Sequence, residues 1–262
     1  MNKDYLFFLK TQDGHCFKVL SELLQNNMKN ICWNLSEDGI TMQTMDLQKH
    51  ILFDMKLEAN NFQTFKYNFD EKNKQIGLTL KYMHSMLKTM KKKDTIELFI
   101  NRANENTLGI RIVPKDTNKV TTSYIKIHMI QNIIVDSPEG YKKSLLIQTN
   151  DFQKMCKSMN IIGNNIHVTS GNTYFKFVCS MDNIYTKEVV FGEIEDDLDT
   201  YEDIFDIEQL LKITKMSGLN KNFHLYFSPK LPLYLKVNVM ELGVLNIYIK
   251  SKRQIEIDEN LN

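Results

Sequence analysis

Residues that could carry out catalysis are scattered along this sequence and do not form a recognisable site. The six histidines show neither H-E-x-x-H nor another spacing typical of metal ligands, so we expect no metal. Residues 243–251 faintly resemble a phosphate-binding loop, but Ile249 stands where such a loop has glycine, and the segment alternates like a strand. Asp196 and Asp197 lie in an acidic run without apolar surroundings, which is typical of a solvated loop rather than of an acid–base pair. The sequence therefore predicts a protein that is not an enzyme and needs no cofactor.

Lysines offer a different chemistry, and residues 80–94 hold the clearest group of them. In a helix, this stretch separates into an apolar face and a basic face. The apolar face comprises Leu80, Met83, Met86, Leu87 and Met90, and the basic face comprises Lys81, His84, Ser85, Lys88, Lys91 and Lys92. Such a basic face is able to meet an anionic partner, whereas the simpler interpretation is a solvated helix surface. The first interpretation gains support because the chain contains three further stretches of related design.

The overall composition is that of an ordinary globular protein, with 42% hydrophobic and 25% charged residues. The formal net charge is only +1, which excludes a polycation that coats nucleic acid through bulk charge. Residues 1–130 hold 19 basic and 14 acidic residues, whereas residues 131–262 hold 14 and 18, and nine of these acids lie between Glu193 and Glu208. Any positive field must therefore come from where the lysines are placed.

The spacing of the cysteines and the lengths of the apolar runs indicate in which cellular compartment we expect the protein. The four cysteines are far apart and never form C-x-x-C, which is typical of reduced thiols in a reducing compartment. No apolar run approaches the roughly 18 residues of a membrane span, and the run near the amino terminus is too short for a signal peptide. We therefore expect an intracellular protein without a membrane partner.

Hydrophobic periodicity predicts the same order of elements twice. In the first half we expect strands at residues 4–10, 31–35, 40–45, 50–57, 62–68, 95–101, 107–113 and 123–129, and helices at 15–26 and 80–94. In the second half we expect strands at 143–148, 166–169, 173–180, 188–192, 203–205, 223–228, 232–240 and 244–250, helices at 150–159 and 206–217, and a polar tail. Asp38 and Gly39 mark a hairpin turn, and Asn150 and Asp151 are predicted to cap the third helix.

Corresponding helices are about 130 residues apart, which indicates an internal repeat. The sequence therefore predicts an α+β fold of two similar domains, each with antiparallel sheets and two helices. The predicted boundaries are 1–129 for the first domain, 130–142 for a connecting loop and 143–262 for the second domain.

Two stretches carry a resemblance to a known family. Residues 32–46, C-W-N-L-S-E-D-G-I-T-M-Q-T-M-D, and their continuation through Leu52 resemble the early hairpin of proliferating cell nuclear antigen, the DNA sliding clamp. Residues 231–249 resemble a later stretch of the same proteins, and Lys88 matches a basic residue on their second helix. The resemblance implies a head-to-tail homotrimeric ring around double-stranded DNA, with helices lining the hole. It also implies a processivity factor that tethers DNA polymerase and other replication and repair proteins, a clamp loader as a further partner, and a nuclear or viral replication compartment.

The resemblance assigns the basic helix faces to DNA. The residues expected to meet phosphates without reading bases are Lys18 on the first helix, Lys81, Lys88, Lys91 and Lys92 on the second, Lys154 and Lys157 on the third, and Lys212 and Lys215 on the fourth. Glu208 stands where the family has a basic residue, and Glu22 also lies on a helix front. Both acids weaken the predicted positive lining.

The resemblance also implies subunit seams and a pocket for partner peptides. The expected seams are edge strands at residues 119–127 and 187–191, with Tyr124 and Val190 buried between subunits. The expected pocket is walled by Met45, Leu52, Ile134, Pro232 and Tyr248. Residues 128–141 are more apolar than a connecting loop needs, which supports a groove, although they could instead fold onto the sheet as a strand. Lys250 at the pocket's rim favours client peptides with acidic flanking residues.

Three alternatives are compatible with the sequence. A processivity factor of the same fold could act as a monomer or dimer without closing a ring. A checkpoint-type clamp would place the chain as one subunit of a heterotrimer. From a different class, the chain could be an enzyme whose catalytic site these patterns do not reveal. The native mass separates the first alternative from a homotrimer, and turnover of a substrate without stimulation of a polymerase would support the last.

Overall fold

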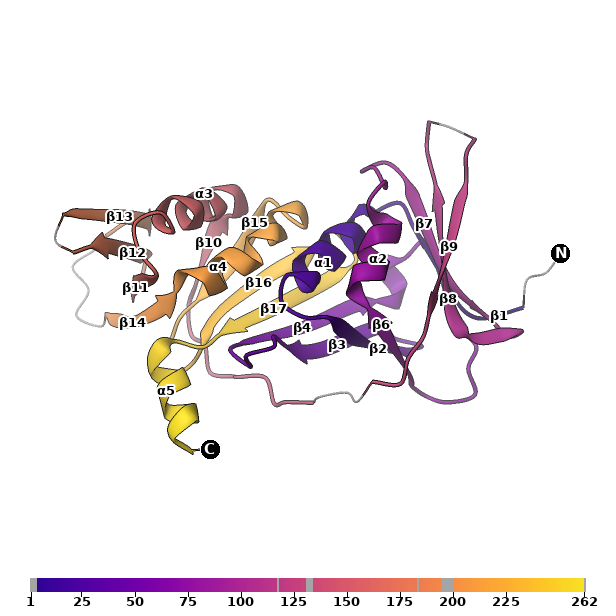
Figure 1. Ribbon diagram of the computed structural model, residues 1–262, viewed down its shortest axis with the longest axis horizontal. Helices are drawn as coiled ribbons and strands as arrows, with labels where there is room; N and C mark the ends of the chain where they lie inside the picture. Colours follow the sequence, from indigo (N-terminus) through magenta and orange to yellow (C-terminus); the bar gives the residue numbers. More distant parts are fainter. Residues whose placement is uncertain (1–3, 117, 131–133, 183, 195–199, 262) are drawn as a thin grey trace. The chain divides into compact units, whose positions relative to one another are not determined.

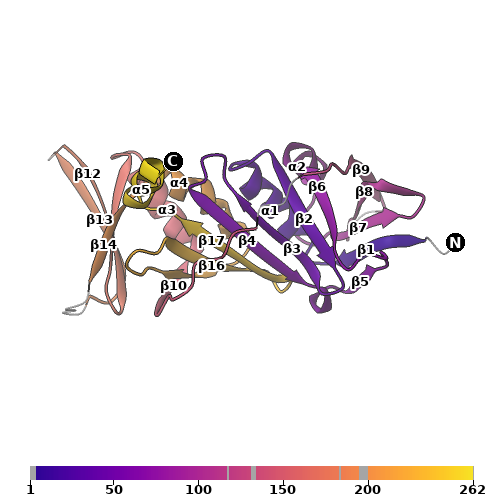
Figure 2. The ribbon, with the colours of Figure 1, turned by 90° about the horizontal axis from the view of Figure 1, so that it is seen from below.

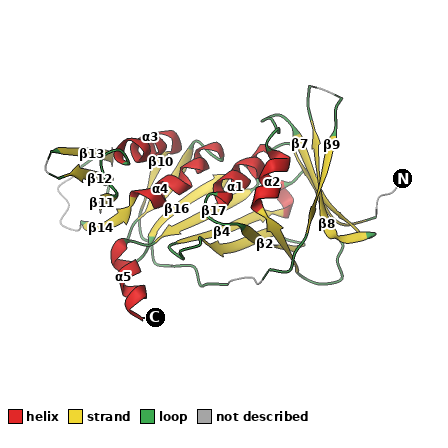
Figure 3. Cartoon of the chain, in the orientation of Figure 1, coloured by secondary structure: helices red, strands yellow, loops and turns green. Residues whose placement is uncertain are grey.

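The computed structural model of the chain describes residues 4–116, 118–130, 134–182, 184–194 and 200–261. The chain forms two compact units (Figure 1). Unit 1 comprises Met1–Thr44, Phe53–Val135 and Asn238–Leu245, and unit 2 comprises Met45–Leu52, Asp136–Val237 and Asn246–Asn262. Each unit combines antiparallel sheets with a pair of packed helices (Figure 3). The predicted α+β fold is confirmed.

Unit 1 is built on two antiparallel sheets (Figure 2). The first has the strand order β5-β1-β7-β8-β9, with β1 (Tyr5–Thr11), β5 (Thr64–Tyr67), β7 (Thr95–Asn101), β8 (Asn104–Val113) and β9 (Thr121–Lys126). The second has the order β4-β3-β2-β6, with β2 (Asn30–Ser36), β3 (Gly39–Met45), β4 (Ile51–Glu58), which runs into the 3-10 turn η1 (Ala59–Asn61), and β6 (Lys74–Thr79). Asp38 and Gly39 form the predicted hairpin turn, with Ser36 opposite Gly39. The φ angle of Gly39 is +138°, a conformation that favours glycine.

The helices α1 (His15–Gln25) and α2 (Leu80–Leu87) of unit 1 pack against each other (Figure 1). The ring of Phe17 on α1 lies 6.0 Å from that of Trp33 on β2, so α1 packs on the second sheet. On α2, the residues Leu80, Met83 and Leu87 are buried. The apolar stripes read from the sequence are therefore the sides of the helices that form the core of this unit.

Unit 2 repeats this construction. One sheet has the order β10-β15-β16-β17, with β10 (Ser144–Gln148), β15 (Asn222–Tyr226), β16 (Leu233–Val239) and β17 (Gly243–Ile249). The other has the order β13-β12-β11-β14, with β11 (Asn165–Ser170), β12 (Tyr174–Met181), β13 (Tyr185–Gly192) and β14 (Tyr201–Asp206). Helix α3 (Thr149–Met159) packs against α4 (Ile207–Ile213) and the 3-10 helix η2 (Thr214–Gly218). On α3, the Phe152 ring lies 6.1 Å from Phe177 of β12 and 5.2 Å from Phe223 of β15, which joins the helix to both sheets.

Apart from β5, which has no counterpart in unit 2, the strands of the two units follow the same order. The order β4-β3-β2-β6 corresponds to β13-β12-β11-β14, and β1-β7-β8-β9 corresponds to β10-β15-β16-β17. In this correspondence β9 matches β17, and β13 matches β4. The strands β4 and β17 are hydrogen-bonded neighbours and each contributes residues to both units. In contrast, β9 and β13 are edge strands of their sheets.

Several element ends differ from the sequence expectation. Helix α2 ends at Leu87 rather than at residue 94, so Lys88 is its C-cap, still in helical conformation, and Lys91 and Lys92 lie beyond it. Here the chain turns instead, because the Met90 N–H donates to the Leu87 carbonyl at 3.0 Å and the Asp94 carboxylate accepts the Lys91 N–H at 2.9 Å.

The capping prediction for the third helix was wrong, and the fourth helix changes type. Helix α3 begins at Thr149, its N-cap is Gln148, and the Gln148 side chain makes no capping bond. In the second unit's other helix, the carboxylate of Asp206 does cap α4 by accepting the Glu208 N–H at 2.9 Å. The α-helix ends at Ile213, and the predicted remainder continues as η2.

Two elements have no counterpart in the sequence prediction. The strand β6 was not predicted, because a glycine and flanking polar residues obscure its alternation. The expected polar tail contains the helix α5 (Lys252–Leu261). Its start carries a reciprocal cap: Ser251 N–H donates to the Gln254 side-chain oxygen at 2.9 Å, and Gln254 N–H donates to the Ser251 hydroxyl at 3.3 Å. This capping box, S-x-x-Q, was visible in the sequence.

The cysteines are free and buried, as predicted. Burial raises the pKa of the Cys16 and Cys156 thiols well above the usual range. Within the described ranges, no helix has the length and apolar character needed to cross a membrane.

Candidate nucleic-acid and partner interfaces

In unit 1, the predicted DNA-contacting lysines fall into two kinds. Lys81 and Lys88 are exposed, and they project from the side of α2 opposite its buried residues. Lys18 on α1 is half-buried, and its Nζ donates to the Met90 carbonyl oxygen at 3.1 Å. Lys18 therefore ties α1 to the segment that follows α2, whereas Lys81 and Lys88 extend into solvent.

Burial and nearby charges at the start of α1 affect the pKa of His15. Burial, followed by the positive charges of Lys18 and Lys92, lowers the pKa of His15, and Glu22 opposes this effect. Lys92 is thus close enough to Lys18 to share its field, although Lys92 lies beyond the end of α2. Lys18 and Lys92 therefore both lie near His15 at the start of α1.

In unit 2, more of the predicted lysines interact with other residues than in unit 1. Lys154 and Lys157 are exposed on α3, but the Lys154 Nζ lies 3.4 Å from an oxygen of Asp151. Lys212 lies on α4 and Lys215 on η2, and both take part in further interactions. A surface ion pair such as that of Lys154 leaves a screened positive charge.

Glu208, which departs from the family's basic pattern, is exposed in the first turn of α4. The positive end of the helix dipole favours a carboxylate in this turn. The local helix start therefore gives a structural reason for an acid at this position.

The helix pair of each unit is held by an equivalent hydrogen bond. Phe17 and Phe152 are the buried aromatic residues of α1 and α3, and the next residue in each helix reaches a backbone carbonyl. In unit 2, the Gln153 Nε2 donates to the Thr214 carbonyl at 3.2 Å, just as Lys18 does to that of Met90. This tie was not visible in the sequence, because it depends on where the second helix ends.

The predicted partner pocket is mostly in unit 2, where it has an aromatic floor. Leu52 and Tyr248 are each 6% exposed, whereas Met45 and Pro232 are half-buried. Beside them, Tyr248 stacks on Tyr234 with 4.6 Å between ring centroids. Leu52 and Tyr248 are thus almost covered, whereas Met45 and Pro232 are the more accessible of these four predicted residues.

Three further tyrosines complete this aromatic surface. Tyr226 stacks on Tyr234 at 4.6 Å, and the hydroxyl of Tyr141 donates to the Pro232 carbonyl at 2.7 Å. Burial, with smaller contributions from Tyr248 and Tyr234, raises the pKa of Tyr141. The sequence analysis missed Tyr141, Tyr226 and Tyr234. The cross-strand pairing of Tyr226 with Tyr234 follows from the strand register, which the sequence alone did not supply.

Ile134 belongs to unit 1 and is 82% exposed. The next residue is firmly held, because Val135 N–H donates to the Gln43 side-chain oxygen and the Gln43 amide donates to the Val135 carbonyl, both at 2.7 Å. Residues 131–133 lie outside the described residues. In the rest of the stretch only His128 forms an isolated bridge, residues 129–130 and 134–141 belong to no strand, and Ile134 is exposed, so the alternative that this stretch folds onto the sheet as a strand is wrong for its described part.

The cation predicted at the pocket's rim, Lys250, has an acidic partner that the sequence analysis did not expect. The Lys250 Nζ lies 2.6 Å from an oxygen of Asp258 on α5. A cavity next to this pair is lined by Gln48, Lys49, His50, Lys250, Ile255, Asp258 and Glu259. The unpredicted helix α5 thus brings carboxylates to a place where the sequence suggested only a cation.

The predicted seams are edge strands. Strand β9 ends its sheet, and Tyr124 on it is 59% exposed with its ring edge-on to Phe99 at 6.2 Å. Strand β13 ends the corresponding sheet of unit 2, and Val190 on it is half-buried. Both edges carry side chains that a further strand would cover.

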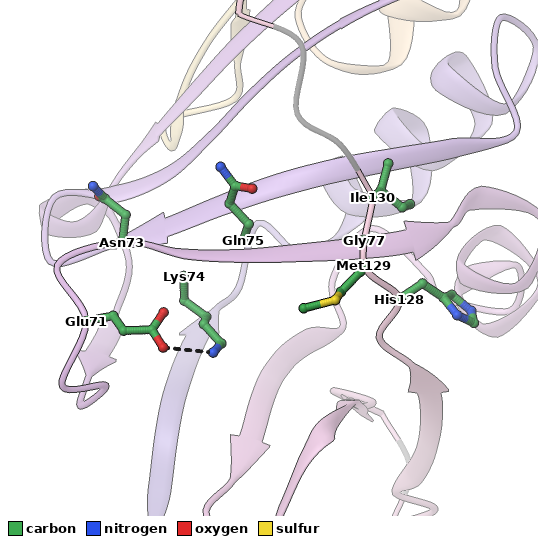
Figure 4. A pocket seen from close by; sticks show the side chains of 8 residues that line it. All are labelled: Glu71, Asn73, Lys74, Gln75, Gly77, His128, Met129 and Ile130. Atoms are coloured by element: carbon green, nitrogen blue, oxygen red, sulfur yellow. Dashed lines mark hydrogen bonds and ion pairs between the residues drawn. The ribbon is translucent and has the colours of Figure 1, made fainter.

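A larger cavity, of about 600 Å³, lies beside β6 in unit 1 (Figure 4). Gly77 and His128 form a bridge at its wall, with N–H···O distances of 3.0 and 2.9 Å, and Met129 is fully exposed. Glu71 and Lys74 form an ion pair at its other end. The lining contains no nucleophile next to a base, and no cluster of three or more acidic, histidine or cysteine side chains able to hold a metal occurs in the described part of the chain.

Comparison with known proteins decides the family. The family model described as "Proliferating cell nuclear antigen, N-terminal domain" matches residues 6–139, which is just over half of the chain. The chain belongs to the proliferating cell nuclear antigen family. Proteins of this family are non-enzymatic processivity factors, so membership separates the chain from enzymes.

Two viral relatives resemble this family member over nearly its whole length. "Uncharacterized protein 436R" of Invertebrate iridescent virus 6 is 25% identical, and the match covers 94% of this chain and 92% of the relative. "Probable DNA polymerase sliding clamp 1" of Paramecium bursaria Chlorella virus 1 is 22% identical, with 93% and 96% covered. Family and relative together support a sliding-clamp role, with DNA and polymerase as the partners that the family implies.

The tie made by Lys18 can be tested through stability. Lys18→Ala should lower the free energy of unfolding by about 0.5–1.5 kcal/mol because the Met90 carbonyl loses its partner. Lys18→Gln should keep most of the stability, since Gln153 makes the equivalent bond in unit 2. Urea unfolding followed by circular dichroism measures both, with exposed Lys81→Ala as the control. Equal destabilisation by the alanine and glutamine variants would contradict the proposed tie.

Proposed function

We propose that this chain is a DNA sliding clamp that encircles double-stranded DNA without sequence preference and tethers a DNA polymerase. The observation that carries this proposal is the sheet correspondence between the two units, which leaves β9 and β13 as unpaired counterparts of β17 and β4. An edge strand with free backbone groups pairs readily with another strand. Strand β9 of one copy meeting β13 of the next would repeat a pairing that the chain already makes once.

Such a contact is heterologous, because two different surfaces meet, and heterologous contacts form either rings or open filaments. We favour a closed ring because the contact between copies, β9 with β13, would repeat the pairing that β4 and β17 make within the chain. By resemblance to the family, the ring is a homotrimer with functional domains at 1–129 and 143–262 and a connecting loop at 130–142. A clamp loader and replication or repair proteins are the further partners, in a nucleus or viral replication compartment.

The lysines support the DNA part of the proposal. Lys81, Lys88, Lys157 and Lys215 are exposed on the amphipathic helices, and Lys91 and Lys92 are exposed just beyond α2. Long, solvated side chains hold phosphates electrostatically and read no base edges, which permits movement along the duplex. The compensated charge of Lys154 weakens the attraction without removing it.

The partner-peptide groove would use the surface formed by Met45, Leu52, Pro232 and Tyr248, together with Ile134. The tyrosine stack supports a rigid apolar floor for a hydrophobic and aromatic peptide. Lys250 still favours clients with acidic flanking residues, although its ion pair with Asp258 screens part of this attraction. A monomeric or dimeric factor, or a heterotrimer subunit, would keep this groove but would differ in native mass.

The DNA prediction uses charge reversal on exposed helix positions. Changing Lys81, Lys88 and Lys215 to Glu should weaken duplex binding and polymerase stimulation, because phosphates would then meet negative charge. The slope of log affinity against log salt should become shallower by about 0.9 for each phosphate that the variant no longer neutralises. A control triple variant, Lys72→Glu, Lys142→Glu and Lys236→Glu, changes exposed lysines outside this surface by the same total charge. Equal weakening in both triples, or a strong preference of the wild type for one DNA sequence, would refute the proposal.

The ring prediction concerns the two edge strands. Tyr124→Asp and Val190→Asp should each reduce the native mass from that of a ring to that of the 30.8 kDa chain, because a buried aspartate would lie in the seam. Native mass spectrometry measures this directly. Tyr82→Asp is the matched control, since Tyr82 on α2 is 58% exposed and Tyr124 is 59% exposed. Unchanged mass in both seam variants would show that the subunits join elsewhere.

The client prediction concerns the aromatic groove. Ile134→Ala combined with Tyr248→Ala should abolish binding of a hydrophobic-aromatic clamp-binding peptide and leave the ring mass intact. Isothermal titration calorimetry measures the peptide affinity. Ile161→Ala combined with Tyr174→Ala serves as the control, because Ile161 (81%) and Tyr174 (8%) match the exposure of Ile134 (82%) and Tyr248 (6%) and belong neither to the predicted pocket nor to the tyrosine stack. If the double variant binds the peptide as tightly as wild type does, the pocket is elsewhere.

A further inference from the structure

A cavity of about 520 Å³ opens in unit 1 where α1 ends and α2 begins. It is lined by Gln25, Met28, Lys29, Thr79 and Lys81. Backbone hydrogen bonds fix these residues together: the Leu80 N–H donates to the Lys29 carbonyl at 3.0 Å, and Asn30 pairs with Thr79 between β2 and β6. The cavity is therefore part of the fold and does not depend on loose side chains.

The lining combines an apolar wall with two cations. Met28 is 5% exposed and gives the cavity a polarisable carbon and sulfur surface. Lys29 and Lys81 are exposed, and neither ammonium group has an ion pair or hydrogen bond to another described residue. None of the described residues that line the cavity is acidic. This combination suits a ligand with a flat apolar ring and an anionic group, and the volume lies in the usual range of about 300–1,000 Å³ for small-ligand sites.

The cavity-lining residue Lys81 is followed in the sequence by an exposed aromatic residue. Tyr82 follows Lys81 and is 58% exposed. At 100° per residue, Lys81, Tyr82, Ser85 and Lys88 occupy one contiguous arc of α2, opposite the buried Leu80, Met83 and Leu87. Proteins that bind single-stranded nucleic acid pair a basic groove with aromatic rings on which bases stack.

We propose that this cavity and Tyr82 bind unpaired nucleotides of single-stranded DNA. One base enters the cavity against Met28, a neighbouring base stacks on Tyr82, and the phosphates between them lie near Lys29 and Lys81. A base inside a duplex is stacked on both faces and cannot enter such a cavity, so the site selects single strands. The inference rests on the proposed clamp function and adds to it a contact with the template strand beyond a primer end.

Fluorescence anisotropy with labelled oligothymidylate and with a blunt duplex of random sequence tests this site in the full chain. Tyr82→Ala should lower the oligothymidylate affinity by about 5- to 150-fold, as expected from base stacking of about 1–3 kcal/mol, and leave duplex affinity unchanged. Tyr82→Phe should bind like wild type because the ring is kept. Lys29→Ala should make the salt slope for the single strand shallower by about 0.7, whereas exposed Lys72→Ala should not.

A second measurement locates the bound strand. Irradiation of oligothymidylate that carries 5-iodouracil should give a crosslink that mass spectrometry maps to residues 79–82. The proposal is overturned if wild type does not bind oligothymidylate, if Tyr82→Ala binds it as tightly as wild type, or if that variant loses single-strand and duplex binding equally. Failure of the wild type to stimulate a polymerase on a primed template would instead refute the clamp function, so the two ideas fail in different assays.

Discussion

Unpaired backbone groups at the edges of β-sheets are the constraint on which this architecture depends. Every strand that ends a sheet exposes N–H and C=O groups that bind water or another strand. The chain resolves this once, because β4 and β17 are hydrogen-bonded neighbours: Glu58 N–H donates to Leu242 O at 2.9 Å, and Lys250 N–H donates to His50 O at 3.0 Å. The topologically equivalent strands β13 and β9 have no such partner among the described strands. Because of the internal repeat, the pairing of β4 with β17 within the chain is the pattern for the pairing that we propose between β13 and β9 of two copies.

The helices satisfy a second requirement, which is to cover a sheet while presenting charge to solvent. Phe17 and Phe152 are fully buried beneath α1 and α3, and each contacts aromatic residues of the strands below. Because these anchors hold the helices from one side only, the opposite side is free to vary in sequence. The chain uses that freedom unevenly: α2 exposes lysines that form no ion pair with a described residue, whereas Lys154 on α3 is paired with Asp151 and α4 carries Glu208. The basic character is therefore strongest in unit 1.

Sequence reasoning predicted the repeat and most elements because their signals are local. The alternation of the strands, the apolar stripes of α1 and α2 and the Asp38-Gly39 turn are all contained in short windows. It failed at the end of α2, where a local bond between a side chain and the backbone overrides the hydrophobic periodicity. The end of α2 is set by the Asp94 carboxylate binding the Lys91 N–H, although Met90 keeps the helical periodicity and is buried.

The candidate interfaces divide in the same way. The edge positions of β9 and β13 were expected from the resemblance to the family, whereas the stack of Tyr226, Tyr234 and Tyr248 needs the register of three strands. The Lys250–Asp258 pair was missed because α5 was taken for a polar tail. Its capping box at Ser251 and Gln254 could have revealed the helix, but not the contact that the helix makes.

Lys18 shows how one position meets structural and electrostatic needs at the same time. Its equivalent, Gln153, ties α3 to the carbonyl of Thr214 with a neutral amide, so the tie itself requires no charge. Lys18 makes the corresponding bond to Met90, but a neutral carbonyl does not cancel its positive charge. The charge therefore still acts on the surroundings: burial is the main cause that lowers the pKa of His15, and the charge of Lys18 adds to it. A cation fixed in this way contributes a steady field, whereas the exposed lysines of α2 can follow a moving phosphate. A surface that must attract DNA without arresting it benefits from both kinds, because the field draws the duplex in and the mobile side chains exchange partners at little cost.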